Sequence, residues 1–280
     1  MRIYKVKRGI IIEKNENLFL VENENWDTFI NDDGLYDKAD KLTGKLKPST
    51  GSREALLGDI QAPIQNQEVW ASGVTYLRSK VGRQEESKNA GGGDFYARVY
   101  EAERPELFFK ATPNRVVGPG GKVRIRKDST WDVPEPELTL VITSKGNIVG
   151  YTIGNDMSSR SIEGENPLYL PQAKTYDGCA GLGPCIYVTK DPLPSNTLIQ
   201  LEIERNNNKV FEGSITIDQI KRTFKELAGF LFRETTFPNG CFLMTGTGIV
   251  PGSDFTLQPN DKVSITIGPI GTLVNTVERV

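Results

Sequence analysis

Residues 131–156 are the most informative about the fold, and their sequence is WDVPEPELTLVITSKGNIVGYTIGND. Two segments rich in β-branched and aliphatic residues, 138–143 and 148–153, flank a short polar stretch that contains one glycine. Such segments around a polar turn are typical of a β-hairpin. We expect Lys145 and Gly146 to form a two-residue loop between two antiparallel strands.

The hairpin brings three acidic residues together at its open end. Residues two apart in a strand share a face at about 6–7 Å, so Glu135 and Glu137 project together while Pro136 points away. With the expected loop, Glu135 lies directly opposite Asp156. Carboxylates this close repel one another unless their pKa values rise or a cation binds. The sequence therefore predicts a carboxylate cluster.

The residue types available limit which metal such a cluster can hold. The chain contains no histidine and three cysteines, Cys179, Cys185 and Cys241. The cysteine spacing matches no common zinc arrangement, so we expect buried, inert thiols. Ligands that are all oxygen favour Mg²⁺, with Mn²⁺ or Ca²⁺ as substitutes. The alternative for the acidic pair is a charged strand edge that discourages aggregation.

Composition excludes several classes of partner. Of 280 residues, 25% are charged and 37% hydrophobic, and the formal net charge is −2, which indicates a globular protein without a basic surface for nucleic acid. The longest apolar stretches, such as 138–142 and 241–244, fall short of the roughly 18–20 residues that span a bilayer. We expect no nucleic-acid partner, no membrane partner and a cytoplasmic location.

The chain divides into two unequal parts in an α+β, mostly β fold. Residues 1–65 combine strand-like runs at 3–6 and 18–21 with a charged helical stretch at 37–46, which predicts a small N-terminal α+β domain. Residues 66–280 form the predicted catalytic domain. Its strand-like segments are separated by Gly, Pro and Asn, and they lie at 107–109, 138–143, 148–153, 186–188, 198–203 and 263–267.

Two further segments interrupt the β pattern. Apolar residues at helical spacing predict one helix over residues 218–234 with a buried stripe, formed by Ile220, Phe224, Leu227, Ala228 and Leu231. Residues 82–103 are polar and glycine-rich, which predicts a long loop, either a solvated connection or a lid over a substrate.

Several motifs occur in a fixed order along the larger part. They are Gly73 with Tyr76, residues 105–110, Glu135 with Glu137, Asp156 with Arg160, Lys174, Gly183-Pro184, Gly246-Thr247, and the G-x-x-G-x-L-x-N stretch at 268–275. This order resembles the fumarylacetoacetate hydrolase family over about residues 69–280. The resemblance implies a mixed β-roll catalytic domain and a 2-oxo acid substrate.

The resemblance also implies roles for individual residues. Magnesium would bind Glu135, Glu137 and Asp156. The candidates for catalysis are Glu106 and Lys174, and the candidates for substrate binding are Thr247, Arg160, Ser79 and Lys110. The alternative roles are a structural salt bridge for Lys174 and a solvated strand position for Glu106.

Three departures from the family pattern bear on the reaction. Ser79 stands where family hydrolases carry the histidine that activates water. Glu163 ends a stretch that often reads Arg-Asp-x-Gln in relatives, which casts doubt on shared substrate contacts there. Glu106 replaces a residue that tends to be apolar, and strand alternation puts it on the same face as Lys110.

With these departures, the pattern is similar to family members that dehydrate 2-keto-3-deoxy sugar acids. We expect magnesium-dependent conversion of 2-keto-3-deoxy-D-arabinonate to 2,5-dioxopentanoate in pentose degradation, with Glu106 and Lys174 transferring protons in an order left open. One alternative is a hydrolase or decarboxylase of an acylpyruvate-type 2-oxo acid, with Glu106 or Glu163 as base. The other is a non-catalytic protein that binds a metal and a 2-oxo acid. A homo-oligomer, dimer or tetramer, is expected.

Overall fold

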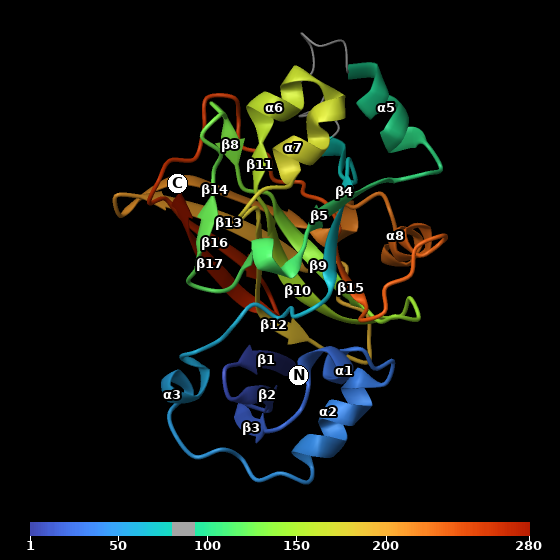
Figure 1. Cartoon of the computed structure of the whole chain (residues 1–280), viewed down its shortest axis with the longest axis vertical. Coiled ribbons are helices and arrows are strands. Elements are labelled where there is room, and N and C mark those ends of the chain that lie inside the picture. The colour runs from blue at the N-terminus through green and yellow to red at the C-terminus, as the bar shows by residue number, and fades with distance from the viewer. Residues whose placement is uncertain (80–92) are drawn as a thin grey trace.

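A computed structural model of the chain describes residues 1–79 and 93–280 (Figure 1). Within these ranges the strands are β1 Arg2–Val6, β2 Gly9–Lys14, β3 Asn17–Val21, β4 Glu68–Gly73, β5 Glu106–Ala111, β6 Val116–Val117, β7 Lys122–Arg124, β8 Asp132–Val133, β9 Pro136–Ile142, β10 Ile148–Asp156, β11 Ser158–Ser159, β12 Ala180–Tyr187, β13 Leu198–Arg205, β14 Asn208–Thr216, β15 Cys241–Met244, β16 Lys262–Ile267 and β17 Gly271–Glu278. The α-helices are α1 Trp26–Ile30, α2 Leu35–Thr43, α3 Arg53–Leu57, α5 Gly93–Glu101, α6 Arg160–Glu165, α7 Leu170–Lys174 and α8 Phe224–Leu231.

Two sheets carry most of the structure. The larger has the order β3-β2-β1-β12-β10-β9-β15-β4-β5, with β6 added beside β12, and the smaller has the order β14-β13-β16-β17-β7. Alternate residues of the two sheets share one apolar core, in which Leu138 and Ile153 of the larger sheet join Leu201, Ile265 and Leu273 of the smaller. The mostly β prediction is confirmed.

The β9–β10 hairpin has the predicted register but a different loop. Glu135 and Asp156 exchange both backbone hydrogen bonds, at 3.2 and 2.9 Å, so they lie directly opposite each other. The loop, however, has three residues, because the amide of Thr143 donates to the carbonyl of Asn147. Gly146 takes a φ of +83°, as the last residue of such a loop often does. An irregularity between Ile148 and Gly150 then restores the expected pairing.

The N-terminal part is continuous with the larger sheet. Strand β1 pairs with β12, Arg2 opposite Tyr187, and an apolar cluster joins Phe29 of α1 to Leu182 and Phe242. The strands expected at 3–6 and 18–21 and the helix expected at 37–46 are present as β1, β3 and α2, whereas β2 was not predicted. The division at residue 65 stays a prediction about where the catalytic part begins.

Helix α8 is shorter than the sequence pattern suggested. It begins after Thr223, whose side chain accepts a hydrogen bond from the amide of Glu226 at 3.1 Å. Ile220 is in extended conformation and bridges to Tyr76, so the prediction that it belongs to the helix is wrong. The remaining stripe behaves as predicted, because Leu227, Ala228 and Leu231 are buried against β9 and β15.

The remaining expectations concern residues 82–103, the three cysteines and membrane-spanning helices. The start of the predicted 82–103 loop lies outside the described residues, and its end forms α5, so the loop assignment is wrong there. Cys179, Cys185 and Cys241 are buried thiols, as expected. Among the residues described, no helix is long and apolar enough to cross a bilayer.

Candidate active site

The carboxylates of Glu135, Glu137 and Asp156 converge as predicted. Glu135 stands immediately before β9, Glu137 lies within it, and Asp156 ends β10. One oxygen from each of the three lies within 4.8 Å of the others, and all three residues are buried. The paired strand ends thus concentrate three acidic groups in a region of low solvent exposure.

Lys174 is in direct contact with two of these carboxylates. The C-terminus of α7 directs its ammonium to Oε2 of Glu135 at 2.7 Å and Oδ2 of Asp156 at 3.1 Å. The same nitrogen donates to Oγ of Ser158 at 2.6 Å. Lys174 is fully buried, which places a cation next to the acidic cluster. Ser158 was not predicted, because a serine two residues beyond Asp156 carries no distinctive sequence signal.

Lys110 makes a separate set of contacts from β5. Its buried ammonium lies 2.5 Å from Oδ1 of Asp156 and donates to the carbonyls of Met157 at 2.9 Å and Lys174 at 2.5 Å. An ammonium has three protons to donate, so these partners use its capacity. Lys110 therefore holds a predicted metal ligand and the end of α7 in place. Substrate contact by Lys110 stays a prediction.

Arg160, the first residue of α6, approaches the cluster from another side. Its Nη2 donates to Oε1 of Glu135 at 2.6 Å, and its Nε lies 3.8 Å from Oε2 of Glu163. Both oxygens of Glu135 are thus paired with cations, one with Arg160 and the other with Lys174. The ion pairs fix the orientation of this carboxylate.

Glu137 differs from its neighbours in its partners. Its Oε2 accepts a hydrogen bond from the amide of Gly246 at 2.5 Å, and within the described residues no Lys or Arg forms an ion pair with it. Burial, followed by the charges of Asp156 and Glu135, holds the pKa of Glu137 well above its usual range. By contrast, burial acts to raise the pKa of Asp156, but Lys110 and Lys174 hold it below its usual value.

This donor set fits a hard divalent cation. All three side chains offer oxygen, and Glu137 is a buried acidic group that a bound cation would stabilise in its charged form. Gly246, which supports Glu137, has a φ of +91°, and a Cβ there would lie 2.1 Å from Oγ1 of Thr75. The glycine of the Gly246-Thr247 motif is therefore required by both conformation and space.

A cavity of about 10 Å³ adjoins the cluster. Its lining residues are Ser72, Gly73, Val74, Ser79, Phe108, Glu135, Arg160 and Thr247. This space holds about one water molecule, so a larger ligand would require side chains to move. Of the predicted substrate-binding residues, Thr247, Arg160 and Ser79 are on the wall. The Ser79 hydroxyl donates to the carbonyl of Tyr76 at 2.7 Å.

Glu106 lies on β5, on the strand face that carries Phe108 of the cavity wall. Its Oε2 is buried and has no hydrogen-bond partner within residues 1–79 and 93–280. A buried acidic oxygen without a partner is costly for the folded protein. It is also available to a ligand.

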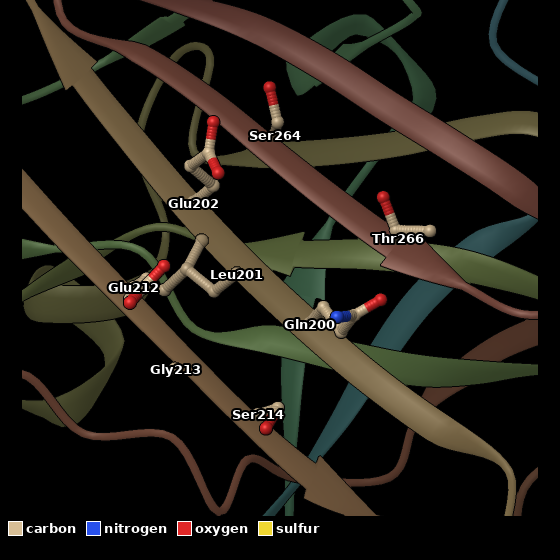
Figure 2. A pocket seen from close by; sticks show the side chains of 8 residues that line it. All are labelled: Gln200, Leu201, Glu202, Glu212, Gly213, Ser214, Ser264 and Thr266. Atoms are coloured by element: carbon tan, nitrogen blue, oxygen red, sulfur yellow. The ribbon is translucent and has the colours of Figure 1, made fainter. Parts of the chain in front are cut away.

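A second, wider hollow lacks both the carboxylate cluster and a buried carboxylate oxygen without a partner. It measures about 390 Å³ and lies over β13, β14 and β16, which carry the labelled lining residues (Figure 2). Its two carboxylates, Glu202 and Glu212, are both paired with Lys209, at 2.7 and 2.9 Å. None of its lining residues belongs to the acidic cluster. We therefore assign the candidate site to the small cavity.

Comparison with known proteins gives concordant results. Residues 69–278 match the family model described as fumarylacetoacetate (FAA) hydrolase, C-terminal. The chain is 48% identical over 244 residues to a probable 2-keto-3-deoxyxylonate dehydratase of Haloferax volcanii, covering 86% of this chain and 83% of that relative. It is 47% identical over 223 residues to the 2-dehydro-3-deoxy-D-arabinonate dehydratase of Saccharolobus solfataricus, covering 79% and 74%.

Solved structures show the same likeness over the full length. A 2-keto-3-deoxy-D-arabinonate dehydratase complexed with magnesium and 2,5-dioxopentanoate superimposes with a TM-score of 0.85 at 37% identity, covering 100% of this chain and 99% of the other.

Proposed function

The chain belongs to the fumarylacetoacetate hydrolase family, and from this premise we propose that it is a magnesium-dependent hydro-lyase acting on a 2-keto-3-deoxy sugar acid. The proposed reaction converts 2-keto-3-deoxy-D-arabinonate to 2,5-dioxopentanoate in pentose degradation. The observation that carries the proposal is a buried carboxylate cluster with Lys174 in contact and a buried Glu106 oxygen nearby, in a chain without histidine. The names of the two dehydratase relatives support the substrate class.

The cluster residues would hold the metal ion. Glu135, Glu137 and Asp156 are its proposed ligands, and their oxygen donors suit magnesium, with manganese or calcium as substitutes. When bound, magnesium supplies Lewis-acid stabilisation of the negative charge that develops on a 2-oxo acid. The contacts from Arg160, Lys110 and the Gly246 amide keep the ligand carboxylates oriented.

Two groups of the protein are proposed to move the protons. One removes a proton from C3 of the substrate, and the other protonates the C4 hydroxyl as it leaves, so that one water is lost per turnover. A further proton shift from C5 to C3 then gives an enol with a double bond between C4 and C5, and transfer of its hydroxyl proton to C4 yields the aldehyde. Glu106 and Lys174 are the candidates, since both are titratable and lie at the site. No step requires an activated water, which is consistent with Ser79 in place of a histidine.

The remaining parts of the proposal concern recognition and assembly. Thr247, Arg160 and Ser79 are proposed to contact the substrate, because they line the cavity. A homo-oligomer, dimer or tetramer, is proposed from the sequence resemblance, and light scattering would test it. The cytoplasm is the proposed location, since the acids in the relatives' names are metabolic intermediates.

Product analysis tests the function. The protein with magnesium is incubated separately with 2-keto-3-deoxy-D-arabinonate and with an acylpyruvate, and products are identified by NMR and mass spectrometry. The expected result is 2,5-dioxopentanoate from the sugar acid and no cleavage of the acylpyruvate. Cleavage of the acylpyruvate without dehydration of the sugar acid would replace this proposal with a hydrolase. Lys174→Met should lower turnover on the order of 10²–10⁴-fold without weakening magnesium binding.

A further inference from the structure

Gly73 and Glu106 face each other across two neighbouring strands at the cavity wall. They are directly paired in the antiparallel β4–β5 ladder, so their side-chain positions are on the same face of the sheet. This face is turned to the site, because Phe108 lines the cavity and Lys110 contacts Asp156. Gly73 itself also lines the cavity.

The carboxyl group of Glu106 occupies the space that a side chain at position 73 would need. A Cβ on Gly73 would lie 2.0 Å from Oε2 of Glu106, 2.4 Å from its Cδ and 3.1 Å from its Cγ. These separations are far below van der Waals contact. The φ of Gly73 is not in the left-handed region, unlike that of Gly246. A side chain at position 73 would therefore conflict with the Glu106 carboxyl group, and not with the local backbone conformation.

Little else restrains this carboxylate. The Oε2 atom has no hydrogen-bond partner in the part of the chain that the structure describes. Among the described ion pairs none includes Glu106, so its position depends on the shape of its surroundings. A methyl group at position 73 would displace a flexible side chain without breaking an ion pair or a ladder hydrogen bond.

We propose that Gly73 is a positioning residue whose missing side chain lets the carboxylate of Glu106 lie against the cavity. The inference rests on the proposed function for its catalytic consequence, since it assumes that Glu106 transfers a proton. It predicts a separation of effects: a side chain at position 73 impairs turnover while the fold and the metal site persist. A purely structural glycine would instead affect stability first.

The first test compares Gly73→Ala with Gly229→Ala. Gly229 is an exposed residue of α8, and a Cβ there meets nothing within 4 Å, so it is a matched control. Gly73→Ala should lower kcat on the order of 10²-fold, because a displacement of about 1 Å of a reacting group can have that effect. Its magnesium affinity by calorimetry and its Tm should stay close to those of the wild type. Full activity of Gly73→Ala, or loss of its magnesium binding, would overturn the proposal.

The second test is a double-mutant cycle with Glu106→Gln. If Gly73 acts through Glu106, adding Gly73→Ala to Glu106→Gln should lower kcat by no more than about threefold, because the group that it positions is already gone. Independent action would make the two losses multiply. Multiplicative losses would therefore contradict the proposal even if each single variant is impaired.

A structural readout separates this inference from the proposed reaction. Crystal structures of the wild-type and Gly73→Ala proteins should differ in the position of the Glu106 carboxyl group, with the metal ligands unchanged. An unmoved carboxyl group would refute the positioning role whatever the activity. A wild-type protein that fails to dehydrate the sugar acid, together with a displaced carboxyl group in Gly73→Ala, would refute the reaction and leave the positioning role in place.

Discussion

Glu137 is the carboxylate of the cluster that a bound cation would affect most. Its neighbours Glu135 and Asp156 already contact Lys174, whereas Glu137 has only the Gly246 amide among the partners described. Glu137→Gln keeps the shape and removes the charge, so magnesium affinity should fall by more than the 10–100-fold typical of changes next to metal ligands. Calorimetric titration measures this, with Glu212→Gln on the exposed sheet face as the control.

Removal of the metal ion by a chelator is a second test of the same site. Treatment with EDTA should abolish dehydration, and magnesium should restore it. Full activity of metal-free protein, or an unchanged affinity in Glu137→Gln, would show that the cluster is not the working metal site.

Asp132 is a buried acid outside the cluster whose ionisation opposes folding. Its carboxylate has no well-aligned hydrogen-bond donor within the described ranges, although Ser129 and the Arg126 backbone are near enough to act on its pKa, and Arg279 lies 3.8 Å away. Burial raises the pKa of Asp132 to about 6, although Ser129, Arg279 and Arg126 act to lower it. Because the folded pKa exceeds the unfolded value, stability from this group is complete below about pH 4 and is lost as pH rises through 6.

Asp132→Asn should therefore stabilise the protein at pH 8 by roughly 2–3 kcal/mol and have little effect near pH 4. Urea unfolding of both proteins across this range, in EDTA to remove metal linkage, measures the difference. Other titrating groups cancel between the two proteins. A difference that does not change with pH would mean that folding does not raise the pKa of Asp132.

At the level of single residues, the sequence predicted those contacts that are set by local sequence. The convergence of Glu135, Glu137 and Asp156 followed from strand period and hairpin register, both of which are set within 26 residues of sequence. The amide of Gly246 and the hydroxyl of Ser158 could not be anticipated in the same way. Their contacts depend on a positive φ and on how α7 approaches β11, which no periodic pattern encodes.

At the scale of elements, helix α8 shows how capping overrides an apolar stripe. Thr223 and Glu226 form the T-x-x-E arrangement of a capping box, and the Thr223 side chain accepts from the Glu226 amide. Ile220 continues the apolar spacing, yet it lies before the cap and pairs with Tyr76. The stripe indicated burial correctly, but the cap decided where the helix begins.

Removal of this cap gives a direct test. Thr223→Ala should destabilise the protein by about 1 kcal/mol, because a helix amide loses its partner. Denaturant unfolding measures the change, and Thr236→Ala serves as a control, since Thr236 is exposed and its side chain has no hydrogen bond within the described residues. Equal stability of Thr223→Ala and the wild type would place the start of α8 under the control of packing alone.

In the β9–β10 hairpin, an irregularity in the strand pairing offsets the effect of an unexpected loop length. The two-residue loop expected at Lys145 and Gly146 was wrong, and the actual three-residue loop shifts the pairing by one position next to the turn. The irregularity between Ile148 and Gly150 shifts it back. Burial on both faces of β9 favours this correction, because a slip of one residue would turn Glu137 into the core.

At the scale of the whole molecule, the N-terminal segment and the catalytic part share one sheet and one core. β1 extends the larger sheet at β12 (Figure 1). Buried residues of both parts pack together, among them Ile3, Phe29, Leu182 and Phe242. The strand and helix patterns of residues 1–65 predicted a small N-terminal α+β domain, and this division stays a prediction, since sequence patterns show which strands exist but not which edge they join. Shared packing predicts that both parts unfold together.

Deletion and scanning experiments test this cooperativity. The full chain should unfold in one calorimetric transition, and a fragment of residues 66–280 should aggregate, because it exposes the apolar surface and the β12 edge that β1 and α1 cover.

Phe29→Ala, which removes a fully buried ring, should destabilise the full chain by about 3–5 kcal/mol and lower the Tm of the single transition. Val210→Ala, at an exposed position, is its control. Two separate transitions, of which Phe29→Ala shifts only one, or a soluble and active 66–280 fragment, would mean that the shared core contributes little to the folding of the catalytic part.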